Sequence, residues 1–224
     1  DLREARRVCE GIDYVFHLAA DHGGRGYVDL HQAECATNLA LDGVVFMAAR
    51  DAGVEKVVYA SSGCVYPNYL QEDPDEDIYL TEDMVKPPYD SDNMYGYAKL
   101  MAELTLQSYY KQFGMKAASC RYFTVYGPRG VENHAVIAMI ARAFVGQNPF
   151  VVWGTGAAVR DFLFVEDFVD DLLAVLSLER PFRCEPLNLA SGSELTIREA
   201  VTTILEACGH DATPQYDPTK PDAI

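Results

Sequence analysis

The sequence predicts an α/β fold built on a parallel sheet, and three observations support this. Short apolar runs alternate with helical patterns along most of the chain. The runs are apolar along their length, which is typical of parallel strands that are covered on both faces. The chain has 224 residues, of which 49% are hydrophobic and 23% charged, so it has enough apolar material for a core.

The first half of the chain contains three predicted strands and two predicted helices. In chain order we expect a strand at 14–18, a helix at 37–52, a strand at 56–61, a helix from about 92 to 113 and a strand at 116–122. Gly53 and Gly114 directly follow the two helical patterns, as expected where a helix ends in a left-handed residue.

After Tyr126-Gly-Pro-Arg-Gly130 the pattern changes. We expect a helix at 135–145, strands at 150–153, 159–164 and 187–189, and helices at about 166–178 and from 196 to 209. Thr196-Ile-Arg-Glu199 matches a capping box, in which the threonine and glutamate side chains satisfy the first turn of the helix. These patterns predict a larger domain from 1–125 and about 157–190, and part of a smaller one from 126–156 and 191–224.

Composition excludes several classes of protein. The net charge of −16 argues against nucleic-acid binding, which needs dense positive charge. No apolar stretch is long enough for a membrane span, and no secretion signal is visible. The cysteines form no C-x-x-C pair, so we expect mostly buried, reduced thiols in a cytoplasmic protein; they are Cys9, Cys35, Cys64, Cys120, Cys184 and Cys208.

Residues 68–88 form a polar, acidic insertion between the second strand and the long helix. Acidic runs usually remain solvated, so a surface loop is the favoured interpretation. A mobile flap near a site is the alternative, supported only by the position of the insertion.

Tyr95 and Lys99 are the first candidate site residues. They are four positions apart on a predicted helix, so their side chains share one face, one turn apart. A lysine ammonium beside a phenol favours the phenolate and lowers the pKa of the tyrosine, which can then act as a general base. The Y-x-x-x-K spacing is common by chance, and a surface pair is the alternative.

Ser62 and Cys64 directly follow the second predicted strand, in Ser61-Ser-Gly-Cys-Val-Tyr66. Ligands of open α/β sheets lie beyond the carboxyl ends of the strands, so this hydroxyl and thiol are placed to meet a substrate. A serine-rich turn with a buried cysteine is the alternative. The first predicted strand is likewise followed by a segment of small residues, Leu18-Ala-Ala-Asp-His-Gly-Gly-Arg-Gly26. Such a segment lets a ligand approach the backbone closely, and a flexible loop is the alternative interpretation.

Together these motifs resemble the extended short-chain dehydrogenases, the NAD-dependent nucleotide-sugar epimerases and dehydratases. The resemblance covers essentially the whole chain and involves Asp1-Leu2, Asp13-Tyr-Val-Phe-His-Leu-Ala-Ala20, Asn38, Tyr59-Ala-Ser-Ser62, Val65-Tyr66, Tyr95-Gly-Tyr-Ala-Lys99, Arg121-Tyr-Phe123, Tyr126-Gly-Pro128, Trp153-Gly154, Arg160-Asp161 and Asn188. Within the family, the segments 1–3, 20–26 and 59–67 are most similar to the GDP-mannose 3,5-epimerase branch, with the GDP-fucose synthase branch next.

The resemblance implies a Rossmann-type, doubly wound parallel sheet that binds NAD, and a smaller α/β substrate domain. It implies an enzyme that epimerises a nucleotide-diphosphate sugar through transient oxidation at C4. A UDP-sugar 4-epimerase, a dehydratase or a reductase of the same family is the alternative. The dehydratase is disfavoured because Gly63-Cys64 stand where it carries two acidic residues. A non-catalytic binding module is a second alternative, although Ser62, Tyr95 and Lys99 are present together.

The resemblance also implies roles for individual residues. Tyr95 is the expected base, Lys99 and Ser62 assist it, and Cys64 and His134 move protons beside the ketone; for His134, a capping or surface role is the alternative. Cofactor contacts are expected from Asp1, Leu2, Leu18, Ala19, Ala20, Asn38, Tyr95, Lys99 and Phe123. Substrate contacts are expected from Gly24, Arg25, Ser62, Thr124, Asn133 and Arg160, whose guanidinium suits a diphosphate. No metal is expected.

Three features depart from the family pattern. The Gly-rich phosphate loop is absent, and Gly23-Gly-Arg-Gly26 follows the wrong strand to replace it. Thr124 stands where asparagine is usual, and His22 and Arg25 stand where apolar residues are expected. We therefore expect the chain to be a portion of a protein of roughly 300 or more residues. The helices at 37–52 and 92–113 carry more apolar residues than are needed to cover one face of the sheet. A second apolar face on each helix is compatible with the homodimer that is common in the family.

Overall fold

The computed structural model describes residues 1–70, 78–132 and 134–220, and the chain divides into two compact units. Unit 1 comprises Asp1–His22, Val28–Phe123 and Phe168–Leu189, and unit 2 comprises Gly23–Tyr27, Thr124–Asp167 and Ala190–Ile224. The predicted larger domain also included residues 23–27, 124–125, 157–167 and 190, which belong to unit 2. What each part of the chain binds remains a prediction.

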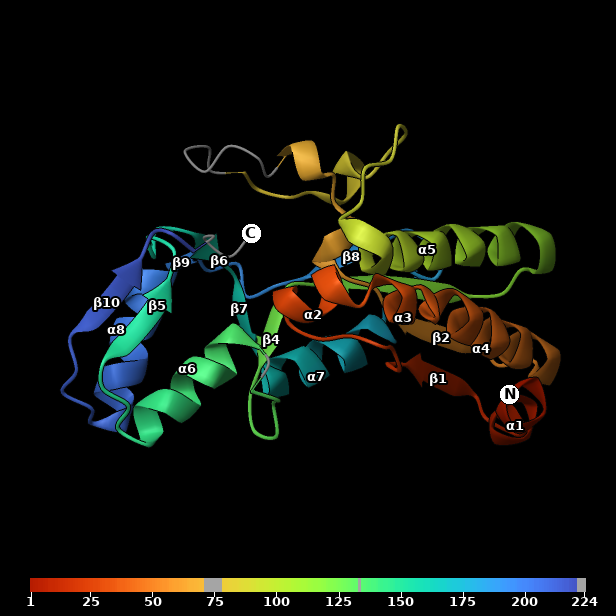
Figure 1. Cartoon of the computed structure of the whole chain (residues 1–224). Coiled ribbons are helices and arrows are strands. Elements are labelled where there is room, and N and C mark those ends of the chain that lie inside the picture. Colours follow the sequence, from red (N-terminus) through yellow and green to blue (C-terminus); the bar gives the residue numbers. More distant parts are fainter. Residues whose placement is uncertain (71–77, 133, 221–224) are drawn as a thin grey trace. The chain divides into compact units, whose positions relative to one another are not determined.

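Unit 1 is built on a four-stranded parallel sheet in the order β1-β2-β3-β8 (Figure 1). Its strands are β1 (Tyr14–His17), β2 (Lys56–Ala60), β3 (Ala117–Tyr122) and β8 (Leu187–Leu189). The three strands predicted before residue 125 are confirmed, each with one limit shifted by a single residue, and 187–189 is confirmed as predicted. The predicted α/β class with a parallel sheet is therefore correct.

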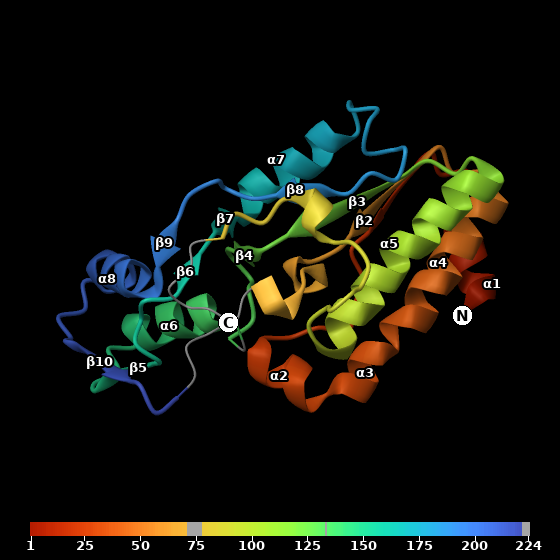
Figure 2. The same cartoon turned by 90° about the horizontal axis from the view of Figure 1, so that it is seen from above.

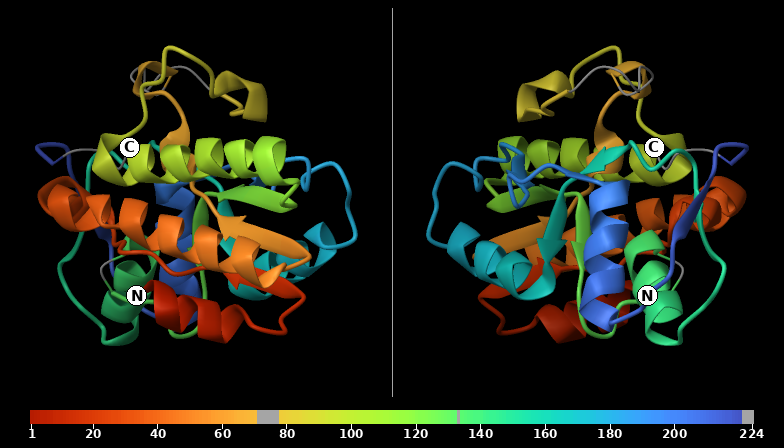
Figure 3. Two further views of the ribbon diagram at one scale, coloured as in Figure 1. Left: turned by 90° about the vertical axis from the view of Figure 1, so that its right-hand side faces the viewer. Right: turned by 90° about the vertical axis from the view of Figure 1, so that its left-hand side faces the viewer.

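Helices cover both faces of this sheet. Figures 2 and 3 show α4 and α5 side by side on one face and α7 on the other. The helices of unit 1 are α1 (Leu2–Cys9), α3 (Gln32–Ala36), α4 (Asn38–Ala52) and α5 (Asn93–Phe113); α2 (Arg25–Leu30) and α7 (Val165–Val175) are shared by the units. Gly53 and Gly114 end α4 and α5 with φ of 70° and 69°, as the sequence predicts.

The core of unit 1 lies between the sheet and helices α1, α4 and α5. Phe46, Tyr59 and Leu106 are completely buried there, with the ring of Phe46 edge-on to that of Tyr59 at 5.5 Å. On the opposite face, the rings of Tyr122 and Phe168 pack at 4.8 Å. Burial of aromatic side chains on both faces fixes the position of the strands and therefore of the loops that leave their carboxyl ends.

Unit 2 contains three two-stranded sheets and two helices. They are the pair β4 (Thr124–Tyr126) and β7 (Phe162–Phe164), the pair β5 (Phe150–Trp153) and β10 (Pro214–Asp217), the pair β6 (Val159–Arg160) and β9 (Leu195–Thr196), and helices α6 (Ala135–Phe144) and α8 (Ile197–Cys208). Helices α6 and α8 pack with β5 in one core. The capping box of Thr196 and Glu199 is confirmed, and α8 ends at Gly209.

The acidic insertion is only partly described. Its residues 71–77 lie outside the described residues, as do most of its acidic side chains. Downstream of them, Leu80, Met84 and Val85 pack against a buried cluster of Val65, Tyr66 and Leu100, around the short 3-10 helix η3 (Glu82–Met84). The prediction of a solvated surface loop holds for the exposed residues Tyr79, Thr81, Asp83 and 86–88, whereas the partly buried apolar side chains contact the core.

Two further predictions concern the chain as a whole. All six cysteines carry thiols; Cys64 and Cys208 are half-buried and the other four are buried. Within the described residues, no helix combines the length and the apolar character needed to cross a membrane.

Candidate active site at the carboxyl end of β2

Ser62 and Tyr95 form the centre of the candidate site. Ser62 is the residue before the 3-10 helix η1 (Gly63–Val65), which begins where the chain leaves β2, and its hydroxyl accepts a hydrogen bond from the Cys64 N–H at 3.2 Å. Tyr95 lies in the first turn of α5, and the nearby Ser62 hydroxyl acts to lower the pKa of its phenol. The predicted meeting of these two side chains at the end of β2 is therefore present in the structure.

Lys99 lies one turn further along α5 and is 1% exposed. Its ammonium donates to the main-chain oxygen of Ala60, the last residue of β2, at 2.8 Å. The nitrogen lies 5.7 Å from the centroid of the Tyr95 ring. Lys99 and Tyr95 therefore converge, and their ring-to-ammonium contact is an attraction rather than a direct ion pair.

Burial governs the protonation of this pair. Burial raises the pKa of Tyr95 far above its usual range, and nearby Tyr122 and Cys64 add to the rise, while the Ser62 hydroxyl opposes it. Burial also lowers the pKa of Lys99. Our expectation that Lys99 lowers the pKa of Tyr95 is wrong for this structure, because the loss of water around the phenol outweighs a cation that points at Ala60.

Cys64 completes the cluster on the η1 side. A thiolate at this position raises the pKa of both Tyr95 and Lys99, so the three groups interact electrostatically. The Cys64 side chain is half-buried rather than sealed in the core. Its main-chain oxygen accepts from the Asp92 N–H at 3.0 Å, which fixes the thiol-bearing turn against the start of α5.

Gly96 permits this close approach of η1 and α5. A Cβ atom added at Gly96 would lie 2.2 Å from the main-chain oxygen of Cys64 and 3.3 Å from the Cβ of Ser91. Neither group is the end of a flexible side chain, so neither can move aside cheaply. The glycine next to Tyr95 is therefore required by packing.

We expect Gly96→Ala to lower the free energy of unfolding by about 1–3 kcal/mol, the usual cost of overpacking a close contact. Urea unfolding followed by circular dichroism measures the change. Gly43→Ala on α4 is the matched control, because an added Cβ at Gly43 meets no atom within 4 Å and alanine is the better helix former. A Gly96→Ala chain as stable as the control would contradict this account of the packing.

Two of the predicted cofactor contacts in unit 1, Asn38 and Asp1, are engaged with the main chain. The Asn38 side chain accepts from the Asp21 N–H at 2.7 Å and donates to the Asp21 oxygen at 2.9 Å, so it fixes the loop that carries Leu18, Ala19 and Ala20. Asp1 is engaged as the cap of α1, where its carboxylate accepts from two main-chain N–H groups. These roles position the backbone, and cofactor contact remains a prediction for all of them.

Phe123 lies at the end of β3, in the same unit. Its ring is stacked on that of Tyr66 with centroids 6.2 Å apart, and it lies close to Gly63. Phe123 thus packs beside the turn that carries Ser62 and Cys64.

The remaining predicted residues belong to unit 2. Gly24 and Arg25 precede or begin α2, Thr124 begins β4, His134 is the residue before α6, and Arg160 ends β6. The Arg160 guanidinium donates to the oxygen of Val159 at 2.5 Å. Asn133 lies outside the described residues. The structure brings together Tyr95, Lys99, Ser62 and Cys64, and the roles of the unit 2 residues remain predictions.

Two buried polar clusters adjoin the site and were not predicted. In one, His17 and Tyr59 both bind the Asp42 carboxylate. In the other, Arg121 makes two hydrogen bonds to Glu103, at 2.9 and 2.7 Å, and Ser61 donates to the same carboxylate at 2.5 Å. Glu103 lies one turn beyond Lys99 on the same predicted helix. A second charged residue on the face that carries Lys99 was the sequence signal that could have indicated a buried ion pair.

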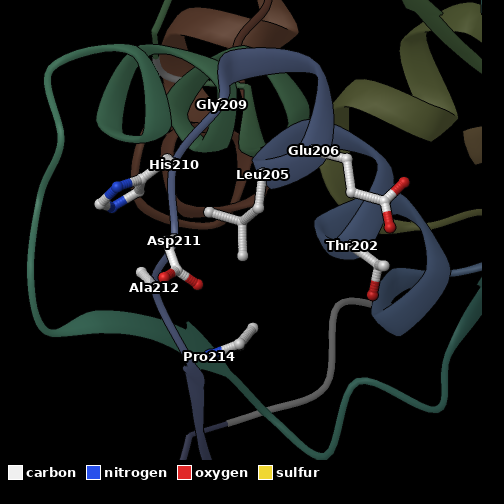
Figure 4. Close-up of a pocket in the computed structure, with 8 residues that line it drawn as sticks. All are labelled: Thr202, Leu205, Glu206, Gly209, His210, Asp211, Ala212 and Pro214. Atoms are coloured by element: carbon white, nitrogen blue, oxygen red, sulfur yellow. The ribbon is translucent and has the colours of Figure 1, made fainter.

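A hollow lies elsewhere, in unit 2 (Figure 4). It has a volume of about 370 Å³ and lies between α8 and the segment before β10, lined by Thr202, Leu205, Glu206, Gly209, His210, Asp211, Ala212 and Pro214. In Figure 4 the His210 ring points away from the hollow, and its Nε2 atom is bonded to the Gln147 oxygen at 2.9 Å. None of the predicted site residues lines it, so it does not define the active site.

Comparison with known proteins settles the family. The model of the "NAD dependent epimerase/dehydratase family" matches residues 1–189. The chain belongs to this family. The resemblance to the extended short-chain dehydrogenases is thereby confirmed.

Several curated relatives of this chain are named for the conversion of GDP-sugars. The GDP-mannose 3,5-epimerase of Arabidopsis thaliana is 32% identical over 209 residues, which is 91% of this chain and 54% of that protein. GDP-L-fucose synthase 1 of the same plant is 33% identical over 218 residues, 93% of this chain and 66% of that protein. The chain spans about half the length of the epimerases that it matches.

Solved structures confirm the Rossmann-type fold. An epimerase of Methanothermobacter thermautotrophicus superposes with a TM-score of 0.83 at 30% identity, covering 97% of this chain and 63% of that one. UDP-glucose 4-epimerase of Thermotoga maritima, solved with UDP-glucose, has a TM-score of 0.83 at 26% identity, covering 100% of this chain and 70% of that one.

Proposed function

We propose that the protein is an NAD-dependent epimerase of a nucleotide-diphosphate sugar, similar in activity to GDP-mannose 3,5-epimerase. The sugar is oxidised at C4, inverted at a carbon beside the resulting ketone, and reduced again. Membership of the family and the relatives named for GDP-sugar conversion support the class of substrate. The observation that carries the proposal is the cluster of Tyr95, Ser62, Lys99 and Cys64 at the end of β2.

The residues of unit 1 suit the nicotinamide half of NAD. Lys99 presents a buried ammonium that can hold a ribose hydroxyl, and Asn38 fixes the loop after β1 at the edge where dinucleotides bind in such sheets. The sequence has no G-x-G-x-x-G motif for the diphosphate. When bound, NAD supplies a reversible acceptor for the hydrogen and electron pair of a sugar C–H bond.

Tyr95 takes the proton of the C4 hydroxyl and later returns it. The Ser62 hydroxyl lies near the Tyr95 phenol, and in the reaction it can donate to the sugar oxygen, which stabilises the developing charge. The C4 ketone makes the hydrogens on C3 and C5 acidic. Cys64 removes one of these protons, and a proton that is added to the other face inverts the carbon.

Exchange of ring hydrogens with deuterated water tests the role of Cys64. In the complete, NAD-loaded protein we expect wild type to incorporate deuterium at a carbon beside C4, measured by mass spectrometry of the sugar nucleotide. Cys64→Ala should retain oxidation at C4, seen as absorbance of the reduced nicotinamide, and lose the exchange. Cys208→Ala is the control, because Cys208 is the other half-buried thiol.

The outcomes separate the alternatives. Exchange that continues unchanged in Cys64→Ala would contradict the role of Cys64. Inversion at C4 without any exchange would assign the protein as a 4-epimerase instead. No change in nicotinamide absorbance with any sugar nucleotide would favour a binding module.

We further propose a cytoplasmic homodimer that forms through α4 and α5. Leu39 on α4 and Met101 on α5 are exposed, and they border a small hollow of about 40 Å³ between the two helices. Exposed apolar side chains on two adjacent helices suit a four-helix interface between copies of the chain.

A further inference from the structure

Beneath Lys99 lies a buried polar cluster of His17, Asp42 and Tyr59. His17 ends β1, Asp42 lies on α4 and Tyr59 lies on β2, and all three are at most 4% exposed. The Nε2 atom of His17 is 2.7 Å from Oδ1 of Asp42, and the Tyr59 hydroxyl donates to Oδ2 at 2.9 Å. Both oxygens of the Asp42 carboxylate are thus engaged, which fixes its position between three secondary-structure elements.

Among the described residues, four side chains that are charged at neutral pH are fully buried: Asp42, Lys99, Glu103 and Arg121. Glu103 and Arg121 neutralise each other through their two direct hydrogen bonds. Asp42 lies 2.7 Å from the His17 ring, which compensates its charge only when the ring is protonated; with a neutral ring, the charges that remain are those of Asp42 and Lys99. Because a buried charge is costly unless an opposite charge compensates it, these two residues are the natural counterparts.

Tyr59 connects the two. Its hydroxyl is bonded to Asp42, and the Lys99 nitrogen lies 4.9 Å from the centroid of its ring. The ammonium is attracted to the ring face, and the carboxylate is attracted to the hydroxyl at the edge of the same ring. Burial lowers the pKa of Lys99, whereas the charge of Asp42 raises it, in agreement with this pairing.

We infer that Asp42 is a positioning residue that supplies the countercharge of Lys99 and so keeps the ammonium beside Tyr95. The groups that act on Lys99 are Tyr95 on its own helix, Tyr59 on β2, Cys64 on η1 and Asp42 on α4. Those that face Asp42 are His17 and Tyr59. The catalytic importance of Asp42 rests on the function proposed above, but the pairing of the two charges does not.

The titration of Lys99 tests the inference directly. The complete protein is labelled with ¹³C at the ε carbon of lysine, and the Lys99 signal is assigned by its loss in Lys99→Arg. We expect Asp42→Asn, which keeps the shape of the side chain and removes its charge, to lower the titration midpoint of Lys99 by about one pH unit or more. Asp42→Ser, also neutral, replaces it if the amide does not allow folding.

Tyr59→Phe is the matched control. It removes a hydrogen bond from Asp42 but keeps the ring under Lys99 and the charge of the carboxylate. We expect it to change the Lys99 midpoint far less than Asp42→Asn. Equal effects of the two variants, or no effect of Asp42→Asn, would overturn the inference and leave Asp42 a purely structural role.

The wild-type protein provides a second measurement, which needs no variant. A buried lysine without a countercharge titrates near pH 5–6, that is about five units below its usual value. A wild-type midpoint in this range would also overturn the inference. Since the titration needs no sugar nucleotide, an absence of turnover would contradict the proposed function alone, whereas an unchanged midpoint would contradict only the inference about Asp42.

Discussion

Tyr95→Phe is expected to reduce turnover of a nucleotide sugar by about a hundredfold to ten-thousandfold in the complete protein, the usual contribution of a positioned acid or base. The substitution removes only the phenol oxygen, the group whose pKa the nearby Ser62 hydroxyl lowers. The ring remains beside Lys99, so binding of NAD should change little. Steady-state turnover and a separate titration of NAD measure the two effects.

Tyr97→Phe is the matched control for this experiment. Tyr97 lies two residues further along α5, and its side chain is 42% exposed rather than buried. The same chemical change there should leave turnover unaltered. Substantial activity of Tyr95→Phe beside an unaltered control would exclude Tyr95 as the base, and loss of NAD binding would assign it a structural role instead.

The pH dependence of turnover follows from the burial of Tyr95. A base must lose its proton to act, and burial raises the pKa of this phenol. We therefore expect turnover to rise as the pH increases through neutrality, because a larger fraction of Tyr95 is then ionised. A cation that lies closer to the phenol would lower this pKa and move the rise to lower pH.

The sequence predicted the sheet of unit 1 because its signals are local. The strands are apolar along their length, as they must be when helices cover both faces. Gly53, Gly114 and Gly209 end their helices in the left-handed conformation, in which glycine carries no steric cost. The Thr196 capping box likewise depends on two side chains three residues apart.

Other features depend on contacts that no local pattern reveals. Helix α1 is only eight residues long and rich in arginine, so the apolar stripe of Leu2, Ala5 and Cys9 that packs against the core of unit 1 is easily overlooked in the sequence. Strands β9 and β10 were missed because short strands are defined by their partners. The predicted strand at 159–164 is interrupted at Asp161, whose carboxylate instead binds the main-chain N–H groups of Ser191 and Gly192.

The protonation of the site was also beyond the sequence. The spacing of Tyr95 and Lys99 correctly predicted that they share a face, but it could not show that water is excluded from both. Burial is a property of the whole packed unit, and here it reverses the expected direction of the Tyr95 pKa. Asp42 and Glu103 appeared in the sequence as ordinary helical acids, although they are the two fully buried carboxylates of the described residues.

Breaking the pair of Arg121 and Glu103 is expected to destabilise unit 1. Arg121→Met leaves the Glu103 carboxylate buried without a countercharge and should lower the free energy of unfolding by about 3–5 kcal/mol. The same substitution removes a donor to the Glu82 oxygen, a bond that tethers the described part of the acidic insertion. Urea unfolding followed by circular dichroism measures the loss, and Arg180→Met, which breaks an exposed pair with Glu185, should leave the midpoint unchanged.

The double variant Arg121→Met with Glu103→Leu distinguishes the cost of an isolated charge from the value of the pair. With both charges gone, no group remains to be neutralised, so the double variant should be more stable than either single one. It still lacks the acceptor of the Ser61 hydroxyl, and Ser61 is the residue that precedes Ser62. We therefore expect a chain that regains stability yet turns over more slowly, whereas a double variant with full activity would show that the pair holds the fold without positioning the site.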